Sequence, residues 1–180
     1  EESPRLDSGS LCIKTIKCFD LKNVERMGKN DPYVKLSIGT WSDETYVEDS
    51  AGDQAFFENL DFKLDVSEDI LLFELLKIQV WDKNDYTKDV FIGEGTCSVK
   101  VLLMAIGKDH DITLDLMDKT HKKKTGKVVV TASVISTAME QAKLTIAQGF
   151  EQGIVKLHRV VTFDLDDIGK GSSAALTFGT

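Results

Sequence analysis

The sequence has few of the features that cross-link a small protein or anchor it in a membrane. Its 180 residues include three cysteines and two prolines, and its longest apolar run, at residues 70–76, is interrupted by Glu74. A bilayer span needs about 20 apolar residues, and the first ten residues lack the apolar core of a signal peptide. Cys12 and Cys18 lie on one predicted strand, about 20 Å apart, and neither forms a CxxC or zinc-ligand pattern with Cys97. We therefore expect free thiols, no structural zinc and a cytoplasmic location.

Basic residues are fewer than acidic residues. The 22 basic and 30 acidic residues leave a net charge of −8. A general nucleic-acid binder neutralises phosphates and normally carries the opposite sign, so we expect no nucleic-acid partner. The charge is also uneven, because residues 43–69 (the acidic segment) hold ten acids and the single base Lys63, whereas residues 119–127 hold five lysines.

Hydrophobic alternation with a period of two predicts a fold made of short strands. Turn-forming stretches rich in Gly, Asn and Asp separate them, and one helical piece is expected near residues 101–106. The alternating phase slips between Thr15 and Ile16, which predicts a β-bulge in the first strand. The sequence therefore predicts an all-β fold, an eight-stranded antiparallel β-sandwich. The expected strands are 11–21, 33–38, 45–47, 59–64, 75–81, 95–101, 111–116 and 127–134.

The pattern changes after Val134. Thr137 and Glu140 have the spacing of a capping box, and residues 138–150 are rich in helix-forming residues. These features favour a short helical linker at 136–152, with an extended linker as the alternative.

Residues 154–180 repeat the opening pattern of the chain. The apolar spacing of residues 11–24 returns at 155–168, the Gly-Lys pair at 28–29 returns at 169–170, and the pattern of 36–40 returns at 176–180. We therefore expect two further strands after the linker, in a module cut from a longer chain. The predicted organisation is an N-terminal extension at 1–10, a complete module at 11–135, the linker at 136–152, and a partial second repeat at 153–180.

Several motifs occur in an order that resembles one known family. Residues 28–35 read GKNDPYVK, and this segment resembles the GKSDPYVK signature of the C2 domain, a calcium- and phospholipid-binding β-sandwich. Residues 11–21, 55–62, 75–82, 91–94 and 126–130 are similar to further segments of that family, in order. The resemblance spans 11–135, and the absence of a strand before Leu11 implies the circular permutation called type II.

The resemblance also implies calcium ligands in the loops at one end of the sandwich. The family's five aspartates fall here on Glu25, Asp31, Asp82, Asn84 and Val90. Only two are aspartates, and Asp85 or Asp89 could substitute through a shifted loop. Because carboxylate number sets calcium affinity, this set predicts weak calcium binding at most. The alternatives are one weak site on Asp31 and Asp82, or solvated acidic loops with structural roles.

Lipid contact in this family uses apolar loop tips or basic patches. The apolar tip candidates are Met27, Tyr86 and Val90, and the basic candidates are Lys122, Lys123 and Lys124. A lysine near an anionic surface contributes on the order of 1 kcal/mol. A lysine run in a hairpin can equally be a solvated turn.

No catalytic motif is present: the sequence has no P-loop, nucleophile elbow or His-centred dyad, so we expect no enzyme activity. The depleted ligand set favours a non-catalytic interaction module of a larger multi-C2 scaffold, with protein partners and a degenerate calcium site. The second repeat supports this view, since Gly171-Ser172-Ser173 stands where the first module has Asp31-Pro32-Tyr33. The alternative is a calcium-dependent module that binds an anionic phospholipid membrane.

Overall fold

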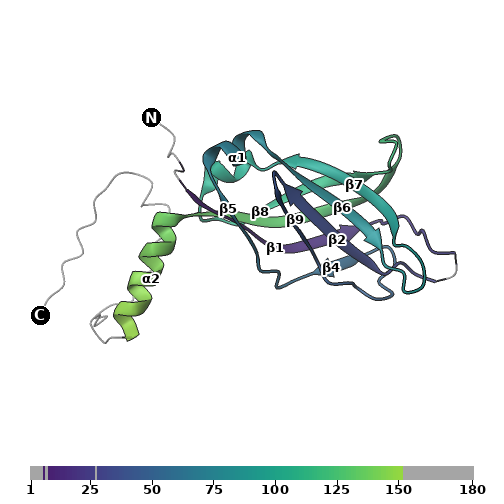
Figure 1. The fold of residues 1–180 in the computed structure, drawn as a ribbon, viewed down its shortest axis with the longest axis horizontal. Helices are drawn as coiled ribbons and strands as arrows, with labels where there is room; N and C mark the ends of the chain where they lie inside the picture. The colour runs from purple at the N-terminus through teal and green to yellow at the C-terminus, as the bar shows by residue number, and fades with distance from the viewer. Residues whose placement is uncertain (1–5, 7, 27, 152–180) are drawn as a thin grey trace, which may run out of the picture. The chain divides into compact units, whose positions relative to one another are not determined.

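The computed structural model describes residues 6, 8–26 and 28–151, which form nine strands and three helical segments (Figure 1). Residues 6–137 form one compact unit. The elements are β1 (Gly9–Phe19), β2 (Pro32–Ile38), β3 (Trp41–Glu44), β4 (Ala55–Phe57), β5 (Phe62–Val66), α1 (Glu68–Phe73), β6 (Leu75–Asp82), β7 (Val90–Ser98), the 3₁₀-helix η1 (Lys100–Ala105), β8 (His110–Met117), β9 (Lys124–Ser136) and α2 (Thr137–Glu151).

All strand pairs are antiparallel and follow the order β3-β2-β6-β7-β8-β9-β1-β4, with β5 also pairing with β1. β7 and β8 share a single paired position, Glu94 with Met117, and the sheet curls there into two facing layers. The two edges meet where the ring of Trp41 on β3 contacts that of Phe62 on β5, with centroids 6.3 Å apart. This arrangement confirms the predicted antiparallel β-sandwich.

Alternating side chains fill the space between the layers. On β6, Leu76, Ile78 and Val80 are fully buried, and the residues between them are partly exposed. β1 also alternates, but its pairing with β9 shifts register between Ile13 and Thr15. This shift confirms the predicted bulge, which keeps the apolar residues on both sides of it directed inward.

Several predicted strand boundaries are wrong. No strand forms at 45–47. The chain instead forms β3 directly after β2, because Gly39 adopts a φ of 55° and turns the chain back. Thr45 still donates its backbone N–H to Val34 O, at 2.9 Å, but no ladder continues from it. The strand expected at 59–64 runs from Phe62 to Val66, and the one expected at 95–101 runs from Val90 to Ser98.

Helix α1 was not predicted. The Ser67 side chain accepts a hydrogen bond from Ile70 N, at 3.4 Å, and caps the start of the helix, while Leu71 packs into the core. The helix has six residues, which is too short to produce a helical hydrophobic period in the sequence. The predicted helical piece near 101–106 is present as η1.

The helix predicted after Val134 is present as α2, Thr137–Glu151. The two further strands and the second repeat, predicted at 153–180, lie outside the described residues. None of the helices in the described part of the chain is long and apolar enough to cross a membrane.

Candidate functional site at the loop end of the sandwich

Asp82 is the central acidic residue of the loop end. It is the last residue of β6, whose alternation directs it inward, and its side chain is fully buried. Its Oδ1 atom accepts a hydrogen bond of 2.6 Å from Asp31 N, whereas Oδ2 accepts none from the described residues. The pKa of Asp82 is raised to about 6, first by burial and then by the neighbouring carboxylates of Glu25 and Asp31, against the lowering effect of the Asp31 N–H. Two such carboxylates repel each other unless a proton or a cation lies between them.

Asp31 connects three loops to this carboxylate. One of its side-chain oxygens accepts a hydrogen bond from Ser50 N, and its backbone carbonyl accepts one from Lys83 N at 2.9 Å. Glu25 is half-buried in the loop that precedes it, where Asn23 Oδ1 accepts a hydrogen bond from its backbone N–H. The structure therefore brings three of the predicted ligands, Glu25, Asp31 and Asp82, to one place.

Asn30 holds the first loop in position and was missed from the sequence. Its side chain is fully buried, its Oδ1 accepts from Val24 N, and its Nδ2 donates to Lys22 O and Gly52 O at 3.0 and 3.2 Å. The amide supplies hydrogen-bond partners to backbone groups that have no strand or helix partner in the loop. The only available signal was its place in a turn before Asp31, which does not distinguish a buried Asn from an exposed one.

Asp89 in the last loop is satisfied by its own neighbours. Its carboxylate accepts hydrogen bonds from Tyr33 Oη at 2.8 Å and Asn84 N at 3.1 Å, and it lies 3.4 Å from Lys83 Nζ. The Tyr33 hydroxyl and the Asn84 N–H hold the pKa of Asp89 below its usual range. Burial and the Asp89 carboxylate in turn raise the pKa of Tyr33 above its ordinary value. A cation would have to displace these partners to use Asp89.

The other predicted last-loop ligands are dispersed. The side-chain nitrogen of Asn84 is buried and forms no hydrogen bond with the described residues, while Asp85 is exposed. Val90 pairs with Asp82 across the β6–β7 ladder and has no side-chain ligand atom. Within residues 6, 8–26 and 28–151, no group of three or more His, Cys, Asp or Glu side chains is arranged to hold a metal ion.

The predicted lipid-contacting residues lie on two loops. Tyr86 is 98% exposed at the tip of the β6–β7 loop, and Met27 lies outside the described residues. The lysines lie in the β8–β9 hairpin, at the same end as the first loop because Lys22 N donates to Thr125 O at 2.8 Å.

The hairpin has a defined shape. Asp118 Oδ1 accepts hydrogen bonds from three backbone N–H groups, those of Thr120, Lys122 and Lys123. Lys124 Nζ lies 2.6 Å from Asp115, so part of its charge is compensated, while the side chains of Lys122 and Lys123 are exposed.

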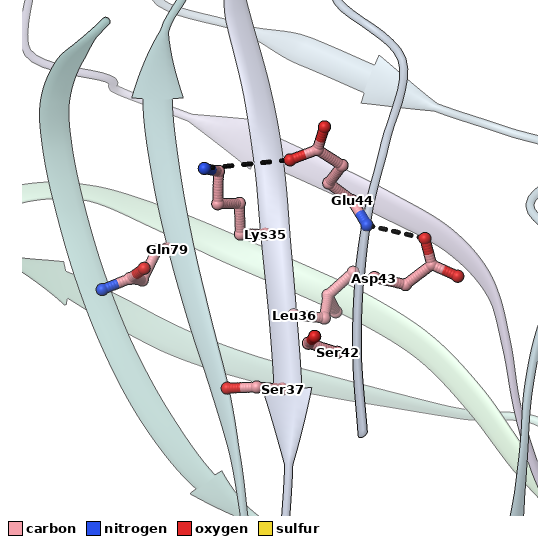
Figure 2. Close-up of a pocket in the computed structure, with 7 residues that line it drawn as sticks. All are labelled: Lys35, Leu36, Ser37, Ser42, Asp43, Glu44 and Gln79. Atoms are coloured by element: carbon pink, nitrogen blue, oxygen red, sulfur yellow. Dashed lines mark hydrogen bonds and ion pairs between the residues drawn. The ribbon is translucent and has the colours of Figure 1, made fainter. Parts of the chain in front are cut away.

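A second feature missed from the sequence is a hollow of about 510 Å³ on the β3-β2-β6 layer (Figure 2). Lys35 and Glu44 form an ion pair of 3.8 Å across it, and Gln79 lines it from β6. The Lys35 ammonium also lies over the rings of Tyr33 and Trp81, at 5.5 and 5.3 Å from their centroids. These contacts fix the lysine on the sheet, and its motif position in GKNDPYVK did not indicate them.

An antiparallel sandwich with acidic residues in the loops at one end defines a class of β-sandwich modules. The family model of the C2 domain matches residues 9–116, and the chain belongs to the C2 domain family. Modules of this family are generally non-catalytic and associate with phospholipid membranes and proteins.

Solved structures share the fold at low sequence identity. A single C2 domain of plant extended synaptotagmin 1 is 20% identical with a TM-score of 0.60, and the match covers 74% of this chain and 97% of that one. The calcium-bound tandem C2 domains of extended synaptotagmin 2 give 21% and 0.57, covering 74% of this chain and 48% of that one. Human GIVD cytosolic phospholipase A2 gives 14% and 0.60, covering 74% of this chain and 17% of that one. A comparison with curated protein sequences finds no match.

Proposed function

We propose that this chain is a non-catalytic C2 interaction module of a larger multi-C2 scaffold protein, with a degenerate calcium site. The main support for the proposal is that a candidate calcium ligand in the last loop is already hydrogen-bonded to other residues of the module. Asp89 is held by Tyr33 and Asn84, and Val90 occupies a ligand position without a side-chain oxygen. A module that binds calcium tightly keeps such oxygens available, because Ca²⁺ takes six to eight of them.

Glu25, Asp31 and Asp82 gather at the loop end without forming a ready-made metal group among the described residues, so they would hold one divalent cation only weakly. Asp82 has a buried oxygen with no hydrogen-bond donor among the described residues, and Glu25 and Asp31 lie beside it. Hard carboxylate oxygens suit Ca²⁺, and a bound cation would neutralise their mutual repulsion. We therefore assign Glu25, Asp31 and Asp82 as the residues that would hold it. The ion would supply a bridge between these carboxylates and a lipid phosphate.

The runner-up is a calcium-dependent module that targets an anionic membrane. Its support is the gathering of an exposed aromatic tip, Tyr86, and the lysine hairpin at the same end as Asp82. In this alternative Lys122 and Lys123 contact the membrane directly, Lys124 after release from Asp115. Asp85 and Asp89 would then join the ligand set after a change in the last loop.

Co-sedimentation of the full chain with vesicles containing phosphatidylserine or phosphoinositide separates the two functions. We expect no gain in pelleting on adding micromolar calcium, and the same result with Asp82→Asn. Calcium-dependent pelleting that Asp82→Asn abolishes, and that Asp61→Asn at an exposed position outside the loop end preserves, would establish the runner-up instead. Calcium-independent pelleting lost when Lys122 and Lys123 are changed to Glu would assign membrane association to the basic hairpin.

The scaffold role also includes the organisation proposed from the sequence. We propose a module at 11–135 with type II topology, a linker at 136–152 and a partial repeat at 153–180. A cytoplasmic module of this kind would associate with other proteins through its charged faces and peripherally with membranes.

A further inference from the structure

The end of the sandwich opposite the loops exposes a group of large apolar side chains. Three of the four residues at 72–75 are involved: Leu72 is 41% exposed, Phe73 is 78% exposed and Leu75 is 52% exposed. On η1, Val101 is 41% exposed and Met104 is 88% exposed. Helices α1 and η1 contact each other, so these five residues lie on two adjoining helices and the first position of β6, and we call them together the α1–η1 surface.

The five exposed side chains are not the ones that anchor α1 and η1 to the core. Leu71 on α1 and Leu102 on η1 already point inward and are fully buried, so each helix is anchored by another residue. Single exposed apolar residues are common, but several large ones on adjoining elements are typical of an interaction site. Aromatic residues and Met are enriched at the centres of such sites, and here Phe73 and Met104 protrude most.

The surface is far from the loop end. β6 begins at Leu75 beside α1 and ends at Asp82, and its eight residues span about 25 Å. Figure 1 shows α1 at one end of the sandwich and the loops that join β6 to β7 at the other. A partner on the α1–η1 surface would leave the loop end free.

The charges around the surface are mainly negative. The acidic segment ends in the first turn of α1, where Glu68 and Asp69 stand next to Asp65 of β5, and Glu74 lies within the apolar group itself. The nearby cations are Lys100 at the start of η1 and Lys108, whose backbone N–H donates to Ala105 O at the end of η1. This excess of acid opposes contact with an anionic membrane. It also opposes two-fold pairing of the surface with itself, which would place like charges together.

Building on the proposed interaction role, we propose that the α1–η1 surface docks an amphipathic helical segment of a protein partner. The apolar face of that segment covers Phe73 and Met104, and its flanking Lys or Arg residues face Asp69 and Glu74. Charge complementarity gives this contact its specificity and the buried apolar centre gives it affinity. The module then has two binding surfaces at opposite ends, one for a protein segment and one for a cation or a membrane.

The probe is a labelled five-turn peptide (about 18 residues) with Leu on one face and Lys on its flanks. Its matched control has Glu in place of every Lys and the same Leu face. Binding to the full chain is followed by fluorescence anisotropy at about 0.15 M salt, where long-range attraction is screened. We expect saturable binding of the Lys peptide and weak binding of the Glu peptide.

The variants separate apolar docking from non-specific charge attraction. Phe73→Ser with Met104→Ser should weaken binding of the Lys peptide at least about tenfold, because the apolar centre is lost. Tyr86→Ser, which removes an exposed aromatic at the other end, should leave binding unchanged. Asp69→Lys with Glu74→Lys should reverse the preference between the two peptides. Unchanged melting temperatures show that the variants remain folded.

Three results overturn the proposal. They are equal affinity for both peptides, binding that survives the Phe73→Ser/Met104→Ser change, and dimerisation or vesicle binding that this change abolishes. None of them depends on the Asp82, Lys122 or Lys123 changes that test the loop end, so failure of this docking site is distinguishable from failure of the proposed function.

Discussion

The Asp82 carboxylate affects both cation binding at the loop end and the stability of the folded module. A buried carboxylate without full compensation destabilises the folded state when it is charged. Asp82 Oδ2, which accepts no hydrogen bond from the described residues, destabilises the charged carboxylate and is also the oxygen best suited to a cation. The neighbouring Glu25 and Asp31 make both effects larger.

Stability should depend on pH through this residue. The folded-state pKa of Asp82 is raised to about 6, above the unfolded value near 3.8, so the folded state binds the extra proton between these values. The contribution of Asp82 to stability therefore falls as pH rises from 4 to 6 and stays low above 6. We expect Asp82→Asn to stabilise the protein at pH 7.5 by about 1–3 kcal/mol and to have little effect at pH 4. Urea unfolding of both proteins across this range measures the difference, and a gain that is the same at pH 4 contradicts the assignment.

Asn30 should be the most sensitive loop residue. Asn30→Ala leaves the backbone groups of Val24, Lys22 and Gly52 without their partner, at a cost of about 2–3 kcal/mol. Asn23→Ala is the control, because Asn23 makes its hydrogen bonds to Glu25 N and Gly28 O in an exposed setting. Urea unfolding should show a shift for Asn30→Ala and a small one for the control. Equal shifts would mean that the buried amide does not organise the loop.

The candidate site could be predicted in part from the sequence. Motif order located Glu25, Asp31 and Asp82, and the structure brings these three together. Position alone could not show that Asp89 is held by Tyr33, because that contact joins β2 to a loop 56 residues away. Buried amides such as Asn30 have the same limitation, since long-range burial leaves no local pattern.

At the scale of elements, the β7–β8 junction shows how glycine shapes the sandwich. A Cβ placed on Gly95 would lie 2.8 Å from Asp115 O and closer still to Leu114 Cδ1. The backbone of β8 therefore approaches β7 too closely for any side chain. This close approach accompanies the curl of the sheet between its two layers.

Gly95→Ala should destabilise the protein by about 1–3 kcal/mol, because the new methyl group pushes against a backbone carbonyl. Thr96→Ala, at the next and exposed position of β7, should change stability by less than about 0.5 kcal/mol. Thermal unfolding measures both. A neutral Gly95→Ala change would show that β7 and β8 can separate without cost.

Sequence pattern predicted the elements whose signal is local. Alternation located β1, β2, β6, β8 and β9, and the phase slip at Thr15 located the bulge. It failed where tertiary pairing decides the structure. Residues 45–47 are β-prone but lie beyond the β2–β3 hairpin set by Gly39, and α1 depends on Leu71 packing into the core.

At the scale of the whole chain, the net charge of −8 hides an organised distribution. The acidic segment runs from β3 to the first turn of α1, and the lysines gather in the β8–β9 hairpin. The loop end is thus acidic at its centre with lysines beside it, whereas the α1–η1 surface is apolar with acidic neighbours. Two surfaces of different chemistry at opposite ends suit a module that links partners.

Calcium should stabilise the module only at high concentration. A cation that binds the folded state alone adds RT ln(1 + [L]/Kd), so a site with a Kd of about 1 mM gains about 1.4 kcal/mol in 10 mM calcium and almost nothing at micromolar levels. Asp82→Asn should remove this gain, because it takes away the central carboxylate. Asp85→Asn should keep it, since Asp85 is exposed and outside the Glu25, Asp31 and Asp82 group.

Thermal unfolding over a calcium series, with magnesium in parallel, measures the effect. A gain that saturates at micromolar calcium would mean that the last loop rearranges and releases Asp89 from Tyr33 as a further ligand. In that event the Tyr33→Phe variant, which removes the donor that holds Asp89, should bind calcium more tightly than the parent chain. The proposed weak site predicts instead that Tyr33→Phe leaves the calcium response unchanged, because the Val90 position still supplies no carboxylate.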